Sequence, residues 1–507
     1  MKKSLGLWTL VARPLLAAMA VVLALAVGAA DASAETVLRI SANTPVRSLD
    51  PAKHSLGQLE YNYSSLVYDR LTAFDDKLNV VPDLAESWEA SADLKTWTYH
   101  LRKGVKFHSG REVDAEDVVA TYKRLADPAN ASVILGSLKI VEKTEAVDKY
   151  TVRFTLSASY SSWPAITAAF QAAILPRDQF DTITTKLIGT GPYKYVSYDP
   201  NGSMELVRNP DYFGAAAFKF DRIVFKIIPD YSTAVAALER GELDIVWGLP
   251  PEFVEKLKGS NAARVSEVPS GAWAMFGMNE SIAPLDNPKV RQAIFKLVDR
   301  KKIAEIALFG HGTPTISPLP PFHPFYDGAI PIGAADPEAA KKLLAEAGFP
   351  DGLTVQLWMP AQQPVLERMA VALRDTAKLA NLTVEIHPVP EDQFRPSTRP
   401  FMINNFFGRT TPDTMIFDWY HSTGSWNTQN WHFKNAEVDK LLEAARQTGD
   451  VAEQKRLYTR FQEIAATEGP GAVVFVLNHA DGVSNRVKGF QSSPLRTLDL
   501  RNVTIAN

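Results

Sequence analysis

The sequence predicts an α/β protein with more than one domain. Strand-like apolar runs alternate with helix-like amphipathic runs along most of the chain, and this alternation occurs on both sides of about residue 275. The chain has 507 residues, which is more than one hydrophobic core usually serves, so two or three domains are expected. The sequence shows no internal repeat of solenoid length, which argues against a repeat architecture.

The N-terminus has the pattern of an export signal. Lys2 and Lys3 precede an apolar run at residues 15–30, and small residues at 32–34 supply a cleavage site of the A-x-A kind. The alternative, a membrane anchor, is disfavoured because the apolar run is shorter than the roughly 20 residues that cross a bilayer. We therefore predict that residues 1–34 are a signal peptide, removed on export.

The composition narrows the class of protein further. The chain is 46% hydrophobic and 22% charged, which is typical of a soluble globular protein. Its net charge of −3, with charges of both signs scattered, excludes a nucleic-acid-binding protein. It has no cysteine, so it can form neither a disulfide framework nor the lipid-modified cysteine of a lipoprotein. We expect a soluble, monomeric protein of the periplasm.

The stretch from Tyr68 to Leu125 can be interpreted locally. Residues 96–101 alternate polar and apolar side chains, which predicts a strand with one buried face. Asp114 fits a helix N-cap, and Asp117, three residues later, completes a capping box. No nucleophile, base or set of metal ligands gathers in this stretch, so we interpret it as scaffold.

Two further sequence patterns in the first half of the chain predict a turn and a helix, each followed by a strand. Residues 189–193, GTGPY, have the glycines of a phosphate loop but lack its lysine and its Ser/Thr ending. They are therefore predicted to form a tight turn into a strand at 193–196. Residues 231–240 are predicted to form a helix ended by Gly241, followed by a strand in LDIVW.

The second half continues the α/β alternation. We predict a strand at 273–279, one amphipathic helix over 286–303 and an extended proline-rich loop over 311–325. Further helices are expected at 337–347, 365–380, 438–446 and 451–466, and further strands at 353–360, 381–389 and 472–477.

Several of these motifs together resemble the family 5 extracellular solute-binding proteins, which are the peptide, nickel and opine-type receptors of ABC importers. The matching pieces are LVYDRL, VVPDLAESWE, WTYHLRKGVKFHSG, the AEDV helix start and the GTGPY turn. An ordered set of this length is more specific than any single short motif. The resemblance implies a two-lobed α/β periplasmic-binding-protein fold with a hinge and an extra subdomain in its first lobe.

The resemblance also implies where the lobes begin and end. The first lobe would span 35–272 and include the extra subdomain, the second lobe would span 273–470, and residues 471–507 would return to the first lobe. The chain would then cross between the lobes twice, near 272–280 and near 470–480. Two crossings make a hinge, and a ligand would be enclosed between the lobes.

Candidate binding residues gather in the segment 399–431, where tryptophan, tyrosine and phenylalanine alternate with asparagine, threonine and serine. A loop that is both aromatic and polar is typical of a solute pocket. We predict that Trp273, Trp419 and Trp426 form stacking walls of the cleft and that Thr44 supplies a polar contact.

Departures from the dipeptide-binding members indicate the charge of the solute. Those members hold the ligand's ammonium with an aspartate four residues before the proline of a D-P-D motif, and Gly408 stands at that distance before Pro412. They hold its carboxylate with an arginine in M-P-V-Q-R-P, where this chain has Gln363 in MPAQQP. Without both anchors, a buried dipeptide zwitterion would cost several kcal/mol.

Arg409, beside Gly408, offers instead a planar fork for a carboxylate or phosphate. We predict an anionic, peptide-like or opine-like solute that meets Arg409, with Gln363 as a polar contact. Replacing Arg409 with alanine should weaken binding at least tenfold, about 1.4 kcal/mol, and unchanged affinity in calorimetry would remove the residue from the site.

Metal binding and catalysis have no supporting motif. None of the nine histidines forms an H-E-x-x-H or an i, i+4 pair on a helix face, although His421 and His432 flank the aromatic segment. No G-x-S-x-G elbow or cysteine supplies a nucleophile.

We expect no cofactor, no metal and no enzymatic activity, and predict a receptor that delivers its solute to an inner-membrane ABC permease. A nickel-chelate or oligosaccharide receptor, and a hydrolase on this fold, stay open as alternatives.

Overall fold

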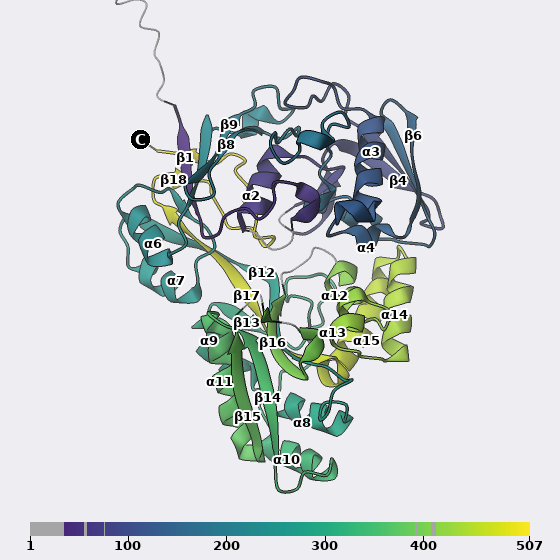
Figure 1. The fold of residues 1–507 in the computed structure, drawn as a ribbon, viewed down its shortest axis with the longest axis vertical. Coiled ribbons are helices and arrows are strands. Elements are labelled where there is room, and N and C mark those ends of the chain that lie inside the picture. Colours follow the sequence, from purple (N-terminus) through teal and green to yellow (C-terminus); the bar gives the residue numbers. More distant parts are fainter. Residues whose placement is uncertain are drawn as a thin grey trace, which may run out of the picture.

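The computed structural model describes residues 35–54, 58–75, 77–390, 393–394, 396–406 and 412–506. These residues form two lobes, one above the other along the long axis of the molecule (Figure 1). Two long antiparallel strands, β12 (Ala263–Met278) and β17 (Gly471–Ser484), run from one lobe into the other. The predicted two-lobed α/β fold is thereby confirmed. The signal peptide predicted at 1–34 lies outside the described residues.

One sheet of eleven strands passes through both lobes. Its order is β15-β14-β16-β12-β17-β11-β1-β10-β9-β8, with β13 paired to β17 beside this path. The remaining strands of this sheet are β1 (Val37–Ala42), β8 (Tyr193–Tyr198), β9 (Ser203–Arg208), β10 (Arg222–Ile227), β11 (Ile245–Val246), β13 (Gly312–Pro314), β14 (Leu353–Pro360), β15 (Leu382–Val389) and β16 (Phe401–Phe406).

The strands β12 and β17 change partners as they pass between the lobes. In the first lobe, residues 263–269 pair with 478–484, and β11 pairs with β17. In the second lobe, residues 273–277 pair with 471–476, and β16 pairs with β12. A register shift separates the two paired segments, and an interrupted ladder is where the lobes can bend relative to each other. The predicted lobe boundaries lie within or beside these strands and stay a prediction.

The first lobe is organised around β1, which pairs in parallel with β10 and β11. Helix α2 (Gln58–Val67) packs with Leu38 and Ile40 on one face of this sheet. Helices α6 (Tyr231–Glu239) and α7 (Pro251–Lys258) pack with Val246 and neighbouring apolar residues in a separate core. The C-terminal tail after β17 joins the α2 core and ends in the small sheet of β18 (Val487–Lys488) and β19 (Thr504–Ile505).

The extra subdomain enlarges the first lobe with a four-stranded antiparallel sheet of order β4-β5-β7-β6. The alternation predicted for residues 96–101 is confirmed, because Trp97, Tyr99 and Leu101 are buried in its core. Its elements are β2 (Thr72–Phe74), β3 (Val80–Pro82), β4 (Ala85–Ala90), β5 (Thr96–Leu101), α3 (Ala115–Ala126), α4 (Leu135–Leu138), β6 (Val141–Asp148), β7 (Thr151–Leu156) and α5 (Trp163–Ile166).

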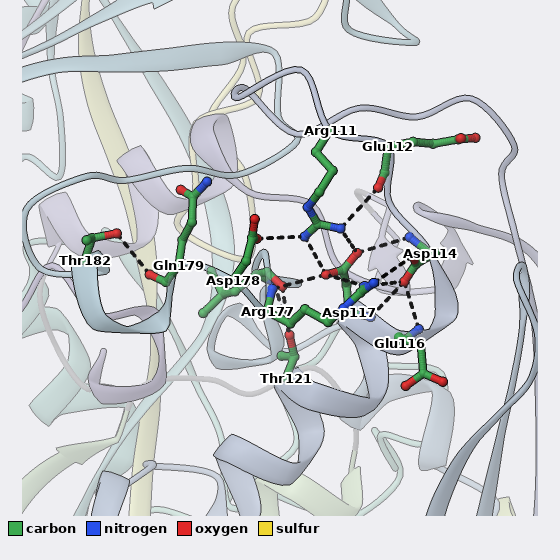
Figure 2. A network of polar contacts seen from close by, with 11 residues as sticks. Arg111, Glu112, Asp114, Glu116, Asp117, Thr121, Arg177, Asp178, Gln179 and Thr182 are labelled. Atoms are coloured by element: carbon green, nitrogen blue, oxygen red, sulfur yellow. Dashed lines mark hydrogen bonds and ion pairs between the residues drawn. The ribbon is translucent and has the colours of Figure 1, made fainter.

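A network of ion pairs fixes the start of α3 (Figure 2). The predicted capping box is confirmed, since Asp114 accepts from the backbone N–H of Asp117 while the Asp117 carboxylate accepts from that of Asp114. The Asp117 side chain is fully buried and accepts two hydrogen bonds, of 2.9 and 2.6 Å, from the guanidinium of Arg111. Arg177 pairs with Asp114 and Asp117, so the network ties a distant segment to the helix N-terminus.

The GTGPY segment is the tight turn into β8 that the sequence predicts. A Cβ on Gly189 would lie 2.0 Å from the Val67 carbonyl oxygen, and one on Gly191 would lie 2.5 Å from that of Leu66. Only glycine allows this close approach of two backbone segments. Thr190, between the glycines, donates a 2.7 Å hydrogen bond to the buried carboxylate of Asp69.

The second lobe places helices on both faces of its half of the sheet. Ala274, Phe276 and Met278 of β12 pack toward α8–α11, whereas Trp273 and Met275 pack toward α12–α15. The helices are α8 (Pro288–Leu297), α9 (Arg300–Leu308), α10 (Pro337–Glu346), α11 (Pro364–Ala377), α12 (Pro412–Tyr420), α13 (Ser425–Asn430), α14 (Ala436–Gln447) and α15 (Val451–Glu468). Figure 1 shows α9, α11 and α12–α15 around β14–β16.

Three predictions for the second lobe need correction. The single helix expected over 286–303 is two helices, because Asp299 leaves the helical conformation and caps α9 through the N–H of Lys302. The proline-rich segment contains the short strand β13, which pairs with β17. The segment 399–431 is not a loop, since it contains β16, α12 and α13.

Among the described residues, no helix combines the length and the apolar character that crossing a membrane requires.

Candidate functional site

The carboxyl ends of the parallel strands in the first lobe point toward the hinge. β1 and β11 run in parallel, with Ile40 opposite Ile245, so the residues that follow both strands lie at one edge. At the same edge, β17 pairs antiparallel with β11 and continues toward the second lobe. In open α/β sheets, ligands bind outside the carboxyl ends of the strands.

The second lobe has the same orientation. β14 and β16 are parallel, with Leu357 opposite Phe401, and β16 pairs antiparallel with β12 so that Phe406 lies opposite Trp273 at the hinge. The carboxyl ends of both half-sheets therefore converge on the hinge strands from opposite sides. A site between two such edges would be lined by the segments that follow β1, β11 and β14.

The first-lobe edge carries polar and aromatic side chains. Asn43, directly after β1, donates a 3.0 Å hydrogen bond to the hydroxyl of Tyr231, and its Oδ1 accepts none. Trp247, directly after β11, is 3% exposed, and its indole N–H has no hydrogen-bond partner. A buried polar group without a partner costs free energy unless another molecule supplies one. At this edge, Asn43 Oδ1 can accept a hydrogen bond from a polar ligand and the Trp247 indole N–H can donate one.

The second-lobe edge is predominantly aromatic. Trp273 and Trp419 meet edge to face with ring centroids 5.6 Å apart, and Trp426 packs 6.4 Å from Trp431. Trp273 is fully buried and Trp419 is 6% exposed, so both belong to the apolar core against α12–α15 in this conformation. Asn405, near the end of β16, has an Oδ1 that accepts no hydrogen bond.

Two of the remaining predicted contacts, Thr44 and Gln363, follow strands that end at these two edges. Thr44 follows β1 in the first lobe and is exposed. Gln363 follows β14 in the second lobe, is partly buried, and makes no side-chain cap to α11. Gly408 and Arg409 lie outside the described residues, directly after β16 in sequence. Contact of these residues with a solute stays a prediction.

A direct contact joins the lobes on the side of the extra subdomain. The Tyr160 hydroxyl donates to the carboxylate of Asp413, which also accepts from the guanidinium of Arg446. Ser161 reinforces the contact, since its N–H donates to the Arg446 carbonyl at 2.9 Å and its Oγ accepts from Gln454 at 3.1 Å. Burial and the Asp413 charge raise the pKa of Tyr160 well above its usual value, so the hydroxyl keeps its proton.

A second contact joins the lobes behind the hinge. His311, just before β13, places its Nε2 2.8 Å from Glu255 of α7 and its Nδ1 3.0 Å from Glu267 of β12. Arg368 of α11 lies 3.6 Å from Glu252 of α7. With contacts on both sides of the hinge strands, the two lobes are closed against each other.

Two open hollows, of about 560 and 440 Å³, lie on the outer surface of the extra subdomain, away from the hinge. In the part of the chain that the structure describes, no three histidine or acidic side chains gather to hold a metal ion. The converging sheet edges are therefore the candidate site.

Sequence reasoning missed several residues of this site. The proximity of Asn43, Tyr231 and Trp247 depends on the pairing of β1 with β11, which the sequence does not indicate. Trp247 itself is the last residue of the predicted strand LDIVW. Tyr160 and Asp413 are 253 positions apart, and no local pattern links them.

Two closed lobes, two hinge strands and a site between converging sheet edges define a two-lobed binding protein. The profile described as bacterial extracellular solute-binding proteins, family 5 Middle, matches residues 79–429. The chain belongs to family 5 of the bacterial extracellular solute-binding proteins.

Three relatives illustrate the range of this family. Heme-binding protein A of Haemophilus influenzae is 31% identical over 474 residues, which cover 86% of each chain. The glutathione-binding protein GsiB of Escherichia coli is 27% identical over 498 residues, covering 94% of this chain and 96% of GsiB. The structure of AgaA from A. tumefaciens in complex with agropinic acid superposes with a TM-score of 0.81 at 25% identity, covering 93% of this chain and 99% of AgaA.

Proposed function

We propose that this protein is the periplasmic receptor of an ABC importer and that it captures a peptide-like or opine-like small solute bearing an anionic group. The observation that carries the proposal is the convergence of both half-sheets, carboxyl ends first, on one pair of hinge strands. Membership of a solute-binding family supports the receptor role over an enzymatic one. The export signal predicted at 1–34 supports the periplasm, and N-terminal sequencing of the mature protein should begin at Glu35.

Two features support an anionic, peptide-like or opine-like solute. Gln363 stands where dipeptide-binding members carry an arginine, and Arg409 follows Gly408 where they carry an aspartate. Among the relatives, GsiB is named for glutathione and AgaA was solved with agropinic acid, and both of these molecules carry carboxylates. The roles of Arg409 and Gly408 rest on the sequence alone.

Capture proceeds by closure of the lobes. The solute would pair the polar atoms at the sheet edges, Asn43 Oδ1, Trp247 Nε1 and Asn405 Oδ1, and would stack on the partly buried ring of Trp426. Closure brings Tyr160 to Asp413 and excludes water from the site, and the closed shape is what a permease would recognise.

Mass spectrometry of whatever denaturation releases from protein purified out of periplasm tests the proposal. Closed receptors keep their solute during purification when dissociation is slow, so one organic mass with a carboxylate or phosphate is expected. A released heme, nickel chelate or neutral oligosaccharide would overturn the solute class. If the protein is empty, a thermal-shift screen over peptides, glutathione, opines, heme and nickel–histidine should stabilise it only with anionic peptides or opines.

A further inference from the structure

The C-terminal tail brings an arginine back to the first-lobe edge of the site. After β17 the tail returns over the first lobe, where Ser492 donates to the Ser266 carbonyl at 2.7 Å and Leu498 and Leu500 enter the core. Arg496 lies between these two anchors. In Figure 1 the yellow tail runs along the first lobe beside α2.

The guanidinium of Arg496 lies among the aromatic residues of that edge. Its Cζ is 5.8 Å from the ring centroid of Trp247, a distance at which a cation interacts with an indole face. Tyr61 of α2, Tyr231 and Asp481 are close enough to act on its charge. Trp247 and Tyr231 border the residues that follow β11 and β1, so Arg496 occupies the edge that faces the hinge.

The backbone of Arg496 is strained. Its φ is +58°, in the left-handed region, within a turn closed by a 2.9 Å hydrogen bond from its N–H to the Ser493 carbonyl. Glycine adopts this conformation without cost, whereas an arginine has a Cβ that opposes it. A strained residue persists only where the surrounding structure holds it in place, and binding sites are one setting in which this occurs.

Asp481 is an acidic group whose charge acts on Arg496, and the Asp481 carboxylate also has partners of its own. Its carboxylate accepts from the N–H of Gly248 at 2.8 Å and from the Ser492 hydroxyl at 2.5 Å, and it lies 3.2 Å from His479. These contacts hold the tail against β17. Arg496 is partly buried, and the loss of hydration lowers the pKa of its guanidinium. An anionic group of a ligand could replace some of that lost hydration.

We propose that Arg496 is a ligand-binding residue that pairs with a carboxylate of the solute from the first-lobe side, against the ring of Trp247. This assignment rests on the proposed function and adds a second cationic contact to the one that the sequence predicts for Arg409. A planar guanidinium suits a carboxylate because it can donate two parallel hydrogen bonds.

The test compares calorimetric binding of glutathione and of glutathione diethyl ester, whose carboxylates are blocked, to the full mature protein. Arg496→Gly should weaken glutathione binding at least tenfold while leaving binding of the ester unchanged. Arg496→Lys, which keeps the charge, should recover part of the preference for glutathione over the ester. The control Asn502→Gly relieves the same left-handed conformation, φ +60°, in the same tail without removing a charge, and should change neither affinity.

The thermal stability of Arg496→Gly distinguishes a role of Arg496 in ligand binding from a role in holding the C-terminal tail. Because glycine tolerates the left-handed turn, Arg496→Gly should have an unfolding midpoint no lower than that of the wild type. A lower midpoint, with glutathione and ester binding weakened equally, would show that Arg496 only holds the tail. Unchanged glutathione affinity in Arg496→Gly would overturn the assignment and leave the proposed function standing. A wild-type protein that binds neither glutathione nor agropinic acid would overturn the proposed solute class and this assignment with it.

Discussion

At the scale of single residues, Asp69 shows how a buried polar group connects sequence motifs. It belongs to the LVYDRL motif and receives hydrogen bonds from Thr190 of GTGPY, at 2.7 Å, and from Tyr212, at 3.3 Å. Burial and the nearby charge of Asp83 raise its pKa to about 8. The carboxyl group is therefore protonated in the folded protein over a pH range in which the unfolded chain ionises it.

This shift predicts a pH dependence of stability. Between pH 4 and pH 8 the folded state binds a proton at Asp69 that the unfolded state has lost, so stability should fall as the pH rises, by up to about 1.4 kcal/mol per pH unit. Asp69→Asn cannot ionise and should flatten the curve in that window. Urea unfolding of both proteins at half-unit pH steps measures the difference, and parallel curves would contradict the assigned pKa.

At the scale of elements, the start of α3 depends on charges from outside the helix. Asp117 is fully buried between Arg111 and Arg177, which are themselves 30% and 39% exposed. Its carboxylate also completes the capping box with Asp114. The helix N-terminus is thus tied to the segment before β8 as well as to its own first turn (Figure 2).

Asp117→Asn should destabilise the protein by about 2 kcal/mol, because it removes the charged partner of both arginines while keeping the side-chain volume. Chemical denaturation monitored by circular dichroism measures the loss. Glu116→Gln is the matched control, since Glu116 is exposed in the same turn and should change stability by less than about 0.5 kcal/mol. Equal effects of the two changes would refute the role of the network.

At the scale of the whole molecule, closure depends on a few contacts across the gap between the lobes. Tyr160 of the first lobe and Asp413 of the second are both buried where they meet. The apolar clusters behind the two residues are separate, so the contact joins two separately packed bodies. It can therefore break without unfolding either lobe.

Tyr160→Phe removes only the hydroxyl and should favour the open form about tenfold, because a hydrogen bond to a charged group contributes about 1.5 kcal/mol. Small-angle X-ray scattering of the solute-free protein should show a larger radius of gyration than in the wild type. The control Tyr150→Phe removes a hydroxyl that donates to Glu112 within the first lobe and should leave the radius unchanged. Identical scattering of all three proteins would exclude the contact as a determinant of closure.

Much of the fold could be predicted from the sequence because its signals are local. The capping box at Asp114, the alternation of residues 96–101 and the helix ended by Gly241 all have the predicted form. The failures also have local causes. The apolar residues of 286–303 keep a helical period across Asp299, so the start of a second helix at that residue was not predicted. The segment 399–431 was predicted to be a loop because it is rich in aromatic and polar residues, although it contains two helices.

The periodicity of the elements, the turn glycines and the ordered motifs that resemble the family are all present in the sequence, because each depends on residues near one another in the chain. Which strands lie side by side at one edge of the sheet depends on the three-dimensional fold. The pairing of β1 with β11 brings the residues after both strands, Asn43 and Trp247, to one edge of the sheet, and the C-terminal tail places Arg496 against the ring of Trp247. These residues are far apart in the chain, so no periodic pattern in the sequence links them. Contacts between the lobes, such as that of Tyr160 with Asp413, exist only after two separately packed bodies meet.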